Sequence, residues 1–229
     1  SVYRDPETGK DITLGNSWKA DVIIDKSYPE NRGLENYRDF ALYFQDEDNI
    51  IGTSFMPYLQ NVAGLTGVNY RLEPWTYRED EGCELGNMFT ACVAAEGDPV
   101  TPVLKAHAGD RVMINIFGAH NEQNQMFNMD GHQWRRHLNQ ENSDMIDAEE
   151  FGGGEYIQAF VNAGGTYSNP GTYLWLNART PYQQAGQWGY FKVLPAGERS
   201  ILPLGGAVPK AGKSASKGVG DDVLSMNQQ

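Results

Sequence analysis

Residues 108–117, with the sequence Ala-Gly-Asp-Arg-Val-Met-Ile-Asn-Ile-Phe, decide the fold class of this chain. A Gly-Asp turn comes first, and after it Val112, Ile114 and Ile116 occupy every second position. Because successive side chains of a strand point to opposite faces of a sheet, this alternation is typical of a half-buried β-strand. The stretch therefore predicts a strand with one face in a core.

Further short strands are predicted on both sides of this one. They fall at residues 20–24, 39–44, 125–134, 155–161, 171–177 and 189–194. Short strands separated by turn signals, with no strong helical periodicity between them, are typical of a Greek-key sandwich or barrel. We predict an all-β Greek-key β-sandwich. Its expected core includes Val112, Ile114, Ile116, Phe127, Tyr173, Trp175 and Phe191.

The composition supports this class and excludes others. The 229 residues are 40% hydrophobic and 11% aromatic, with 26 Gly and 11 Pro, which fits a core cut by many turns and not a helical bundle. The formal net charge of -12 would repel a phosphate backbone, so nucleic acid is excluded as a partner. No run approaches the roughly 20 apolar residues that span a bilayer. Ser1 opens onto polar sequence, so we expect the chain to begin after a processing site or inside a longer polypeptide.

Three regions are expected along the chain. Residues 1–36 are polar and turn-rich around one strand and are predicted to form an N-terminal arm. Residues 37–196 are predicted to form the sandwich, with a long excursion at 52–102 that many Pro and Gly residues interrupt. Residues 197–229 have too few large apolar side chains to offset their own ordering entropy. We expect this extended tail to be flexible or held by a partner.

The two cysteines, Cys83 and Cys92, lie nine positions apart in a glycine-containing stretch. That spacing favours a local disulfide across a hairpin or loop, which would place the chain in an oxidising compartment. The alternative is two unrelated buried thiols.

Several motifs occur in one order along the chain. They are 68–75 (Val-Asn-Tyr-Arg-Leu-Glu-Pro-Trp), 97–102 (Gly-Asp-Pro-Val-Thr-Pro), 108–112, 127–134 (Phe-Asn-Met-Asp-Gly-His-Gln-Trp), 170–175 (Pro-Gly-Thr-Tyr-Leu-Trp) and 185–193. Together they resemble a cupredoxin-type domain of the multi-domain, ceruloplasmin-like bacterial multicopper oxidases, which include manganese-oxidising members. The resemblance covers about residues 68–195 and implies a cupredoxin-like fold, an oxidase context and a periplasmic or extracellular location.

The resemblance also shows which copper ligands this chain lacks. A mononuclear blue-copper site needs a Cys thiolate and two imidazoles with a weak axial ligand. On the family's closing motif, the Cys position falls on Asn177, a copper His on Tyr182 and the axial Met on Gln187. An axial Gln without thiolate or imidazole would bind little copper.

The positions that serve a trinuclear copper cluster in the family are also altered. The two histidines that flank the family's Cys fall on Leu176 and Ala178, and a family His-x-His pair falls on Asp130 and His132. A further family His falls on Glu96. Of this set, His132 is the one remaining imidazole, so we expect no catalytic residue and no cofactor in this chain, with copper only in partner domains or subunits.

Three other site hypotheses remain open at this stage. Two or three of the residues His107, His120, His132 and His137 could form a carboxylate-imidazole metal site, although a core role for His132 and surface positions for the others are the alternative. The acidic residues at 141–150 could bind calcium or form a solvated loop. Aromatic side chains could line a sugar groove or a protein interface, and Trp75, Tyr167 and Tyr182 are those expected to be exposed.

Three functions follow from these observations. The first is a copper-free cupredoxin-like module that works by docking in a larger periplasmic or extracellular assembly. The second is a non-catalytic domain of an active multicopper oxidase whose copper sites lie in other domains. The third is a metal or small-ligand binder that reuses Glu96, Asp130 and His132 as a new site. We expect the chain not to be an enzyme by itself and to have protein partners.

Overall fold

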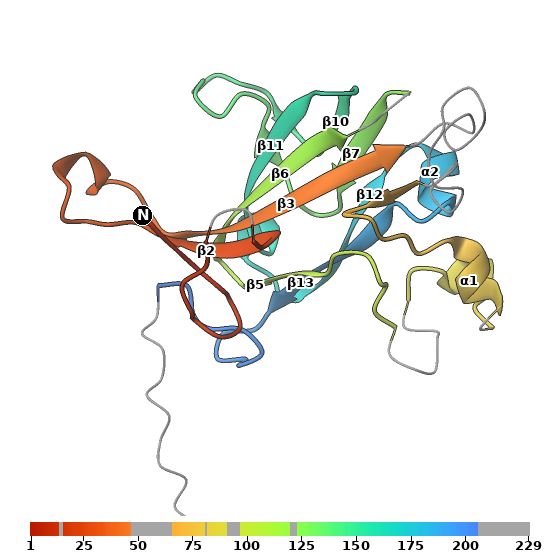
Figure 1. Ribbon diagram of the computed structural model, residues 1–229, viewed down its shortest axis with the longest axis horizontal. Helices are drawn as coiled ribbons and strands as arrows, with labels where there is room; N and C mark the ends of the chain where they lie inside the picture. The colour runs from red at the N-terminus through yellow and green to blue at the C-terminus, as the bar shows by residue number, and fades with distance from the viewer. Residues whose placement is uncertain (14–15, 47–65, 81, 91–96, 120–122, 206–229) are drawn as a thin grey trace, which may run out of the picture.

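Two β-sheets face each other across the core of the protein (Figure 1). The computed structural model describes residues 1–13, 16–46, 66–80, 82–90, 97–119 and 123–205. The strands are β1 (Val2–Arg4), β2 (Lys19–Ile23), β3 (Tyr37–Asp46), β4 (Thr66–Val68), β5 (Leu104–His107), β6 (Arg111–Ala119), β7 (Gln125–Met129), β8 (Trp134–Arg135), β9 (Met145–Ile146), β10 (Ala148–Phe151), β11 (Tyr156–Asn162), β12 (Gly171–Asn177) and β13 (Trp188–Leu194). The helices are α1 (Trp75–Asp80) and α2 (Thr180–Gln184), with 3-10 turns η1 (Pro29–Asn31), η3 (Leu85–Asn87) and η4 (Gly165–Tyr167).

The topology of the sheets is that of a cupredoxin-like β-sandwich, as predicted. One sheet has the strand order β1-β2-β3-β6-β11, with β4 paired to the far end of β3, and the other has the order β10-β7-β12-β13-β5. The pairs β3–β6 and β5–β13 are parallel, whereas the other pairs are antiparallel. Parallel neighbours within an otherwise antiparallel sandwich require the chain to cross between sheets, as a Greek-key fold does.

The core lies between the two sheets and agrees with the predicted residues. Inward-facing side chains on β3 and β6 alternate with outward-facing ones, so that Leu42, Phe44 and Ile114 are fully buried. Of the seven core residues expected from the sequence, six are buried, and Tyr173 is partly buried against the same cluster. The alternation of apolar residues therefore located the core correctly.

The predicted strand over 125–134 is too long. β7 ends at Met129, and the chain then turns at Gly131, whose φ of +68° is a left-handed conformation that favours glycine. A Cβ atom at Gly131 would lie 2.8 Å from Cε1 of Tyr173. The close approach of this ring and the turn together end the strand, and β8 begins only at Trp134.

Part of the long excursion is held by one buried arginine. The guanidinium of Arg78 donates hydrogen bonds to the backbone carbonyls of Met88, Thr90 and Gly97 and lies 4.7 Å from the ring centroid of Trp188. Its Nε also donates to the Glu73 carboxylate at 3.2 Å. One cation therefore joins described residues on both sides of the short elements α1 and η3.

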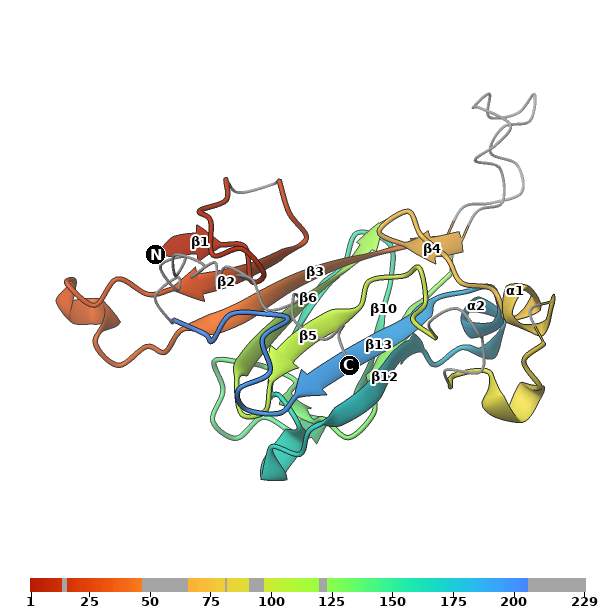
Figure 2. The same ribbon diagram turned by 90° about the horizontal axis from the view of Figure 1, so that it is seen from below.

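The arm continues one of the two sheets. β2 pairs with β3 and β1 pairs with β2, which extends this sheet beyond the sandwich (Figure 2). The predicted arm and sandwich meet at residues 36 and 37, and β3 begins at Tyr37. Of the predicted tail, residues 197–205 are described, and the backbone N–H of Leu202 donates to the carbonyl of Pro6 at 2.8 Å. Hydrogen bonds within the chain thus hold the arm and the start of the tail.

Helices contribute little to this fold. Within the described residues, no helix is long and apolar enough to cross a membrane.

Candidate functional site at the blue-copper positions

The three positions that the resemblance assigns to blue-copper ligands lie together at one end of the sandwich. Asn177 is the last residue of β12, Tyr182 lies in α2, and Gln187 comes directly before β13. The Nδ2 group of Asn177 donates to Oε1 of Gln187 at 2.6 Å. The Tyr182 hydroxyl donates to Oδ2 of Asp46 at 2.8 Å, at the end of β3.

Gln125, the first residue of β7, connects the two halves of this cluster. Its Oε1 accepts a hydrogen bond from Nδ2 of Asn177, and its Nε2 donates to Oδ2 of Asp46 at 3.2 Å. We call Gln125, Asn177 and Gln187, together with Asp46 and Tyr182, the amide network. The sequence gives no indication of Gln125 and Asp46 at this site, because they lie far along the chain from the closing motif.

The amide network also satisfies its own remaining polar atoms. Nε2 of Gln187 donates to the backbone carbonyl of Gln45 at 2.8 Å, and Oδ1 of Asn177 accepts from the backbone N–H groups of Met126 and Arg179 at 3.3 and 3.0 Å. The side chains of the three amide residues are fully buried. A buried polar cluster with every group paired stabilises one specific arrangement of the strands around it.

The chemistry of these side chains does not fit blue copper. A carboxamide nitrogen has no lone pair to offer, and its oxygen is a hard donor, whereas such copper sites use a soft thiolate and imidazoles. The pKa of Tyr182 is raised to about 12, mainly by burial and secondly by the hydrogen bond to Asp46. Its phenol is therefore neutral at physiological pH. We therefore derive no electron-transfer step through these positions.

The two residues that flank Asn177 stand where the family has copper-ligating histidines, but one packs in a hydrophobic cluster and the other is exposed. Leu176 packs in a small hydrophobic cluster with Trp188 and Tyr190. Ala178 is exposed, and its backbone N–H donates to the carbonyl of Met126 at 2.8 Å. Neither side chain contains an atom that ligates a metal.

His132 is buried and fully hydrogen-bonded to the backbone. The Gly164 N–H donates to its Nε2 at 3.0 Å, and its Nδ1 lies 2.8 Å from the carbonyl oxygen of Asp130. Since an N–H can only donate and a carbonyl can only accept, Nδ1 carries the proton and Nε2 is occupied as an acceptor. Burial lowers the pKa of His132, which favours this neutral form. No lone pair of the ring remains for a metal ion.

The surroundings of His132 agree with a packing role. Its ring lies 4.7 Å from the ring centroid of Tyr173 and 5.1 Å from that of Phe191. Asp130 is exposed overall. Partial desolvation of its carboxyl group nevertheless raises its pKa, and the nearby charge of Asp147 raises it further. Glu96, the third residue of the hypothetical reused site, lies outside the described residues.

Of the predicted disulfide, Cys83 is buried, and Cys92 lies outside the described residues.

The other histidines do not share one face in the described part of the chain. His137 is exposed, and His120 lies outside the described residues. His107, expected at the surface, is buried, and its Nε2 lies 2.9 Å from the carbonyl oxygen of Glu198. Among the described residues, no three His, Cys, Asp or Glu side chains are grouped to hold a metal ion. The acidic stretch at 141–150 contains β9 and the start of β10.

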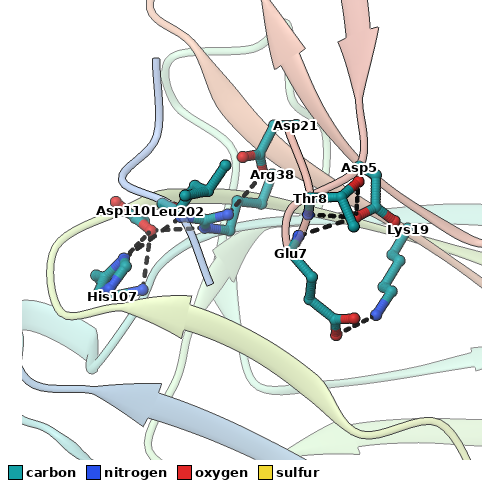
Figure 3. Close-up of polar contacts among 9 residues, drawn as sticks. All are labelled: Asp5, Glu7, Thr8, Lys19, Asp21, Arg38, His107, Asp110 and Leu202. Carbon is teal, nitrogen blue, oxygen red and sulfur yellow. Dashed lines mark hydrogen bonds and ion pairs between the residues drawn. The ribbon is translucent and has the colours of Figure 1, made fainter. Parts of the chain in front are cut away.

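A second buried polar cluster joins the arm, the sandwich and the tail (Figure 3). Arg38, the second residue of β3, is fully buried. Its Nη1 donates to Oδ1 of Asp21 at 2.6 Å, its Nε to Oδ2 of Asp110 at 2.7 Å, and its Nη2 to the carbonyl of Leu202 at 2.7 Å. We call Arg38, Asp21, Asp110, His107 and Leu202 the Arg38 junction. Each contact of the arginine reaches a different region of the chain.

The carboxylates of the Arg38 junction differ in what they contact. Oδ2 of Asp110 also accepts from the backbone N–H of His107 at 2.8 Å. Asp21 lies on β2 and is almost fully buried, and this burial raises its pKa to about 6 although the Arg38 guanidinium acts in the opposite direction. Asp21 thus changes charge in the mildly acidic range.

Comparison with known proteins gives structural matches only. No protein-family model and no curated protein matches the sequence. A multicopper oxidase matches with a TM-score of 0.42 and 12% identity over 67% of this chain and 43% of its own. Copper nitrite reductase from Nitrosomonas europaea matches with a TM-score of 0.45 and 14% identity over 67% of this chain and 47% of its own. McoA multicopper oxidase from the hyperthermophile Aquifex aeolicus matches with a TM-score of 0.42 and 13% identity over 67% of this chain and 28% of its own.

All three neighbours are described as multicopper oxidases or a copper nitrite reductase. At such identities the likeness concerns the fold alone. The chain spans less than half the length of each of these three structures.

Proposed function

We propose that this chain is a copper-free, cupredoxin-like structural module that works by docking in a larger protein assembly. The observation that carries the proposal is the amide network. At the positions where the family places soft copper ligands, Asn177 and Gln187 bond to each other and to neighbouring strands. Such a cluster stabilises the sandwich and offers no thiolate for electron transfer.

The arm provides the surface for association in this proposal. It extends one sheet beyond the sandwich and carries the exposed apolar side chains of Val2, Tyr28 and Leu34. Exposed aromatic and aliphatic side chains at such an extension suit a protein interface. The predicted partner is a protein, either another subunit or further cupredoxin domains of the same polypeptide.

The setting of the module is a periplasmic or extracellular assembly. The predicted Cys83–Cys92 disulfide belongs to this proposal, because such bonds persist in oxidising compartments. Mass spectrometry of the unreduced chain tests it, and two free thiols would contradict it.

The docking role is tested by isolating the native protein, cross-linking it and measuring its mass in solution. We expect a complex larger than one chain, with cross-links on residues 1–36 or on the tail from residue 197 onward. The variant Leu34→Ser should weaken the complex, whereas Leu85→Ser, an exposed leucine outside the arm, should leave it intact. A monomer whose arm and tail resist proteolysis would contradict the proposal.

A further inference from the structure

A row of three aromatic rings crosses the outer face of the sheet that contains β3, β6 and β11. Tyr43, Phe117 and Tyr156 are direct neighbours in the strand register. The ring centroids of Tyr43 and Phe117 lie 4.6 Å apart with an interplanar angle of 10°, and those of Phe117 and Tyr156 lie 4.8 Å apart with an angle of 29°. The rings therefore stack face to face along the row.

Tyr156 is the last ring in this row, because β11 is the last strand of its sheet. One face of the Tyr156 ring is covered by Phe117, and 48% of the residue is exposed. The opposite face of the ring points away from Phe117. Tyr156 also lines a pocket of about 440 Å³ between β11 and the segment that follows β8. Its volume falls in the range of small-molecule sites, roughly 300–1,000 Å³.

Two side chains of this pocket, Tyr156 and Gln158, are held in place by the sheet. The Tyr156 hydroxyl donates to Oδ1 of Asn115 at 2.6 Å, and Nε2 of Gln158 donates to the same oxygen at 3.0 Å. Nδ2 of Asn115 in turn donates to the carboxylate of Asp39 on β3. A phenol and a carboxamide that line the pocket are thus oriented by a hydrogen-bond network on three rigid strands, which is the arrangement that a preorganised binding site requires.

The lining of the pocket is polar but close to neutral in charge. Nε of Arg136 pairs with Oε1 of Glu149 at 3.2 Å, so these two charges balance each other. His137, Gln140 and Gln158 add groups that both donate and accept hydrogen bonds. Neither an anion nor a cation is favoured by such a lining, and a purely apolar ligand would leave its polar groups unpaired.

From this geometry we infer that the pocket beside Tyr156 binds a neutral saccharide. A pyranose ring has an apolar C–H face, which packs on the open face of the Tyr156 ring, and a rim of hydroxyl groups, which both donate and accept hydrogen bonds. Gln158, His137 and Gln140, which also line the pocket, supply donors and acceptors for that rim. This site is separate from the amide network, so its occupancy does not depend on the docking role.

The test is isothermal titration calorimetry of the full chain with cellohexaose, xylohexaose and maltohexaose, and with a hexamer of galacturonic acid as the anionic comparison. We expect at least one neutral hexasaccharide to bind, and the anionic hexamer to bind at least tenfold more weakly. Tyr156→Ala should weaken binding at least tenfold, and Gln158→Ala severalfold. Tyr167→Ala, which removes an 82% exposed tyrosine on η4, should change affinity by less than twofold.

Several results would overturn the inference. These are the absence of binding by all three neutral probes at millimolar concentration, preferential binding of the anionic hexamer, and affinity that neither Tyr156→Ala nor Gln158→Ala reduces. Tyr156 takes part in the aromatic row, so the fold of its alanine variant is checked by circular dichroism. If that variant does not fold, Gln158→Ala, whose side chain is peripheral to the row, decides the outcome.

Discussion

Two buried polar clusters lie at opposite ends of β3 and hold the sandwich together in different ways. The Arg38 junction, at the start of the strand, places a guanidinium between two carboxylates. The amide network, at the end of the strand, joins three carboxamides around a single carboxylate, Asp46. The ionic cluster connects arm, sandwich and tail, whereas the largely neutral cluster connects strands within the sandwich.

The difference between the clusters has an energetic consequence. Removing one member of a buried ion cluster leaves uncompensated charge, while removing one amide leaves only unpaired hydrogen-bonding groups. The Arg38 junction should therefore be the more sensitive to substitution and to pH.

The largest effect is expected for Arg38→Met. The variant leaves the buried Asp21 and the partly buried Asp110 without their cation, which should lower the free energy of unfolding by about 3–5 kcal/mol at pH 7.5. Denaturant-induced unfolding measures this loss. Lys192→Met removes an ion pair with Asp98 that is partly exposed and should cost about 0–1 kcal/mol. Equal losses in the two variants would contradict the structural role of the junction.

A smaller effect is expected for Asn177→Ala. This variant leaves the buried oxygens of Gln125 and Gln187 and two backbone N–H groups without their partner, and should lower the free energy of unfolding by about 1–3 kcal/mol. Asn128→Ala is the control, because its hydrogen bond to the carbonyl of Asp147 is exposed and should contribute no more than about 0.5 kcal/mol. If the two variants have the same stability, the amide network contributes nothing specific.

The smallest effect is a change in the pH dependence of stability. Native Asp21, with its pKa raised to about 6 by burial, binds a proton more readily than it does in the unfolded chain. Its contribution to stability is therefore largest below about pH 4 and is lost as the pH rises through about 6. Asp21→Asn should flatten the curve of unfolding free energy between these values, and Asp98→Asn should leave it unchanged. An unaltered slope in Asp21→Asn would show that another group is responsible.

The two clusters also differ in how far the sequence predicts them. The closing motif placed Asn177, Tyr182 and Gln187 together, because they lie within eleven residues of one another and the family pattern gives their spacing. Arg38 contacts residues that are 17, 72 and 164 positions away. No local sequence pattern predicts such contacts, because they depend on how the strands cross between the sheets.

The strands themselves were predicted well where apolar residues alternate. The prediction for residues 171–177 matches β12, and the residues of β6 lie on the expected faces. The prediction failed at Gly131, where a neighbouring ring and a left-handed turn end the strand. Gln125 and Asp46 were missed because a buried amide or carboxylate gives no signal in sequence until its partners are known.

The most direct test of the account concerns the blue-copper positions themselves. The purified chain is titrated with Cu(II), and its visible absorption is recorded. Because Asn177 and Tyr182 stand where a thiolate and an imidazole are needed, we predict no intense thiolate-to-copper band. The appearance of that band would contradict the amide network as the structure of this site, and with it the proposal of a copper-free docking module.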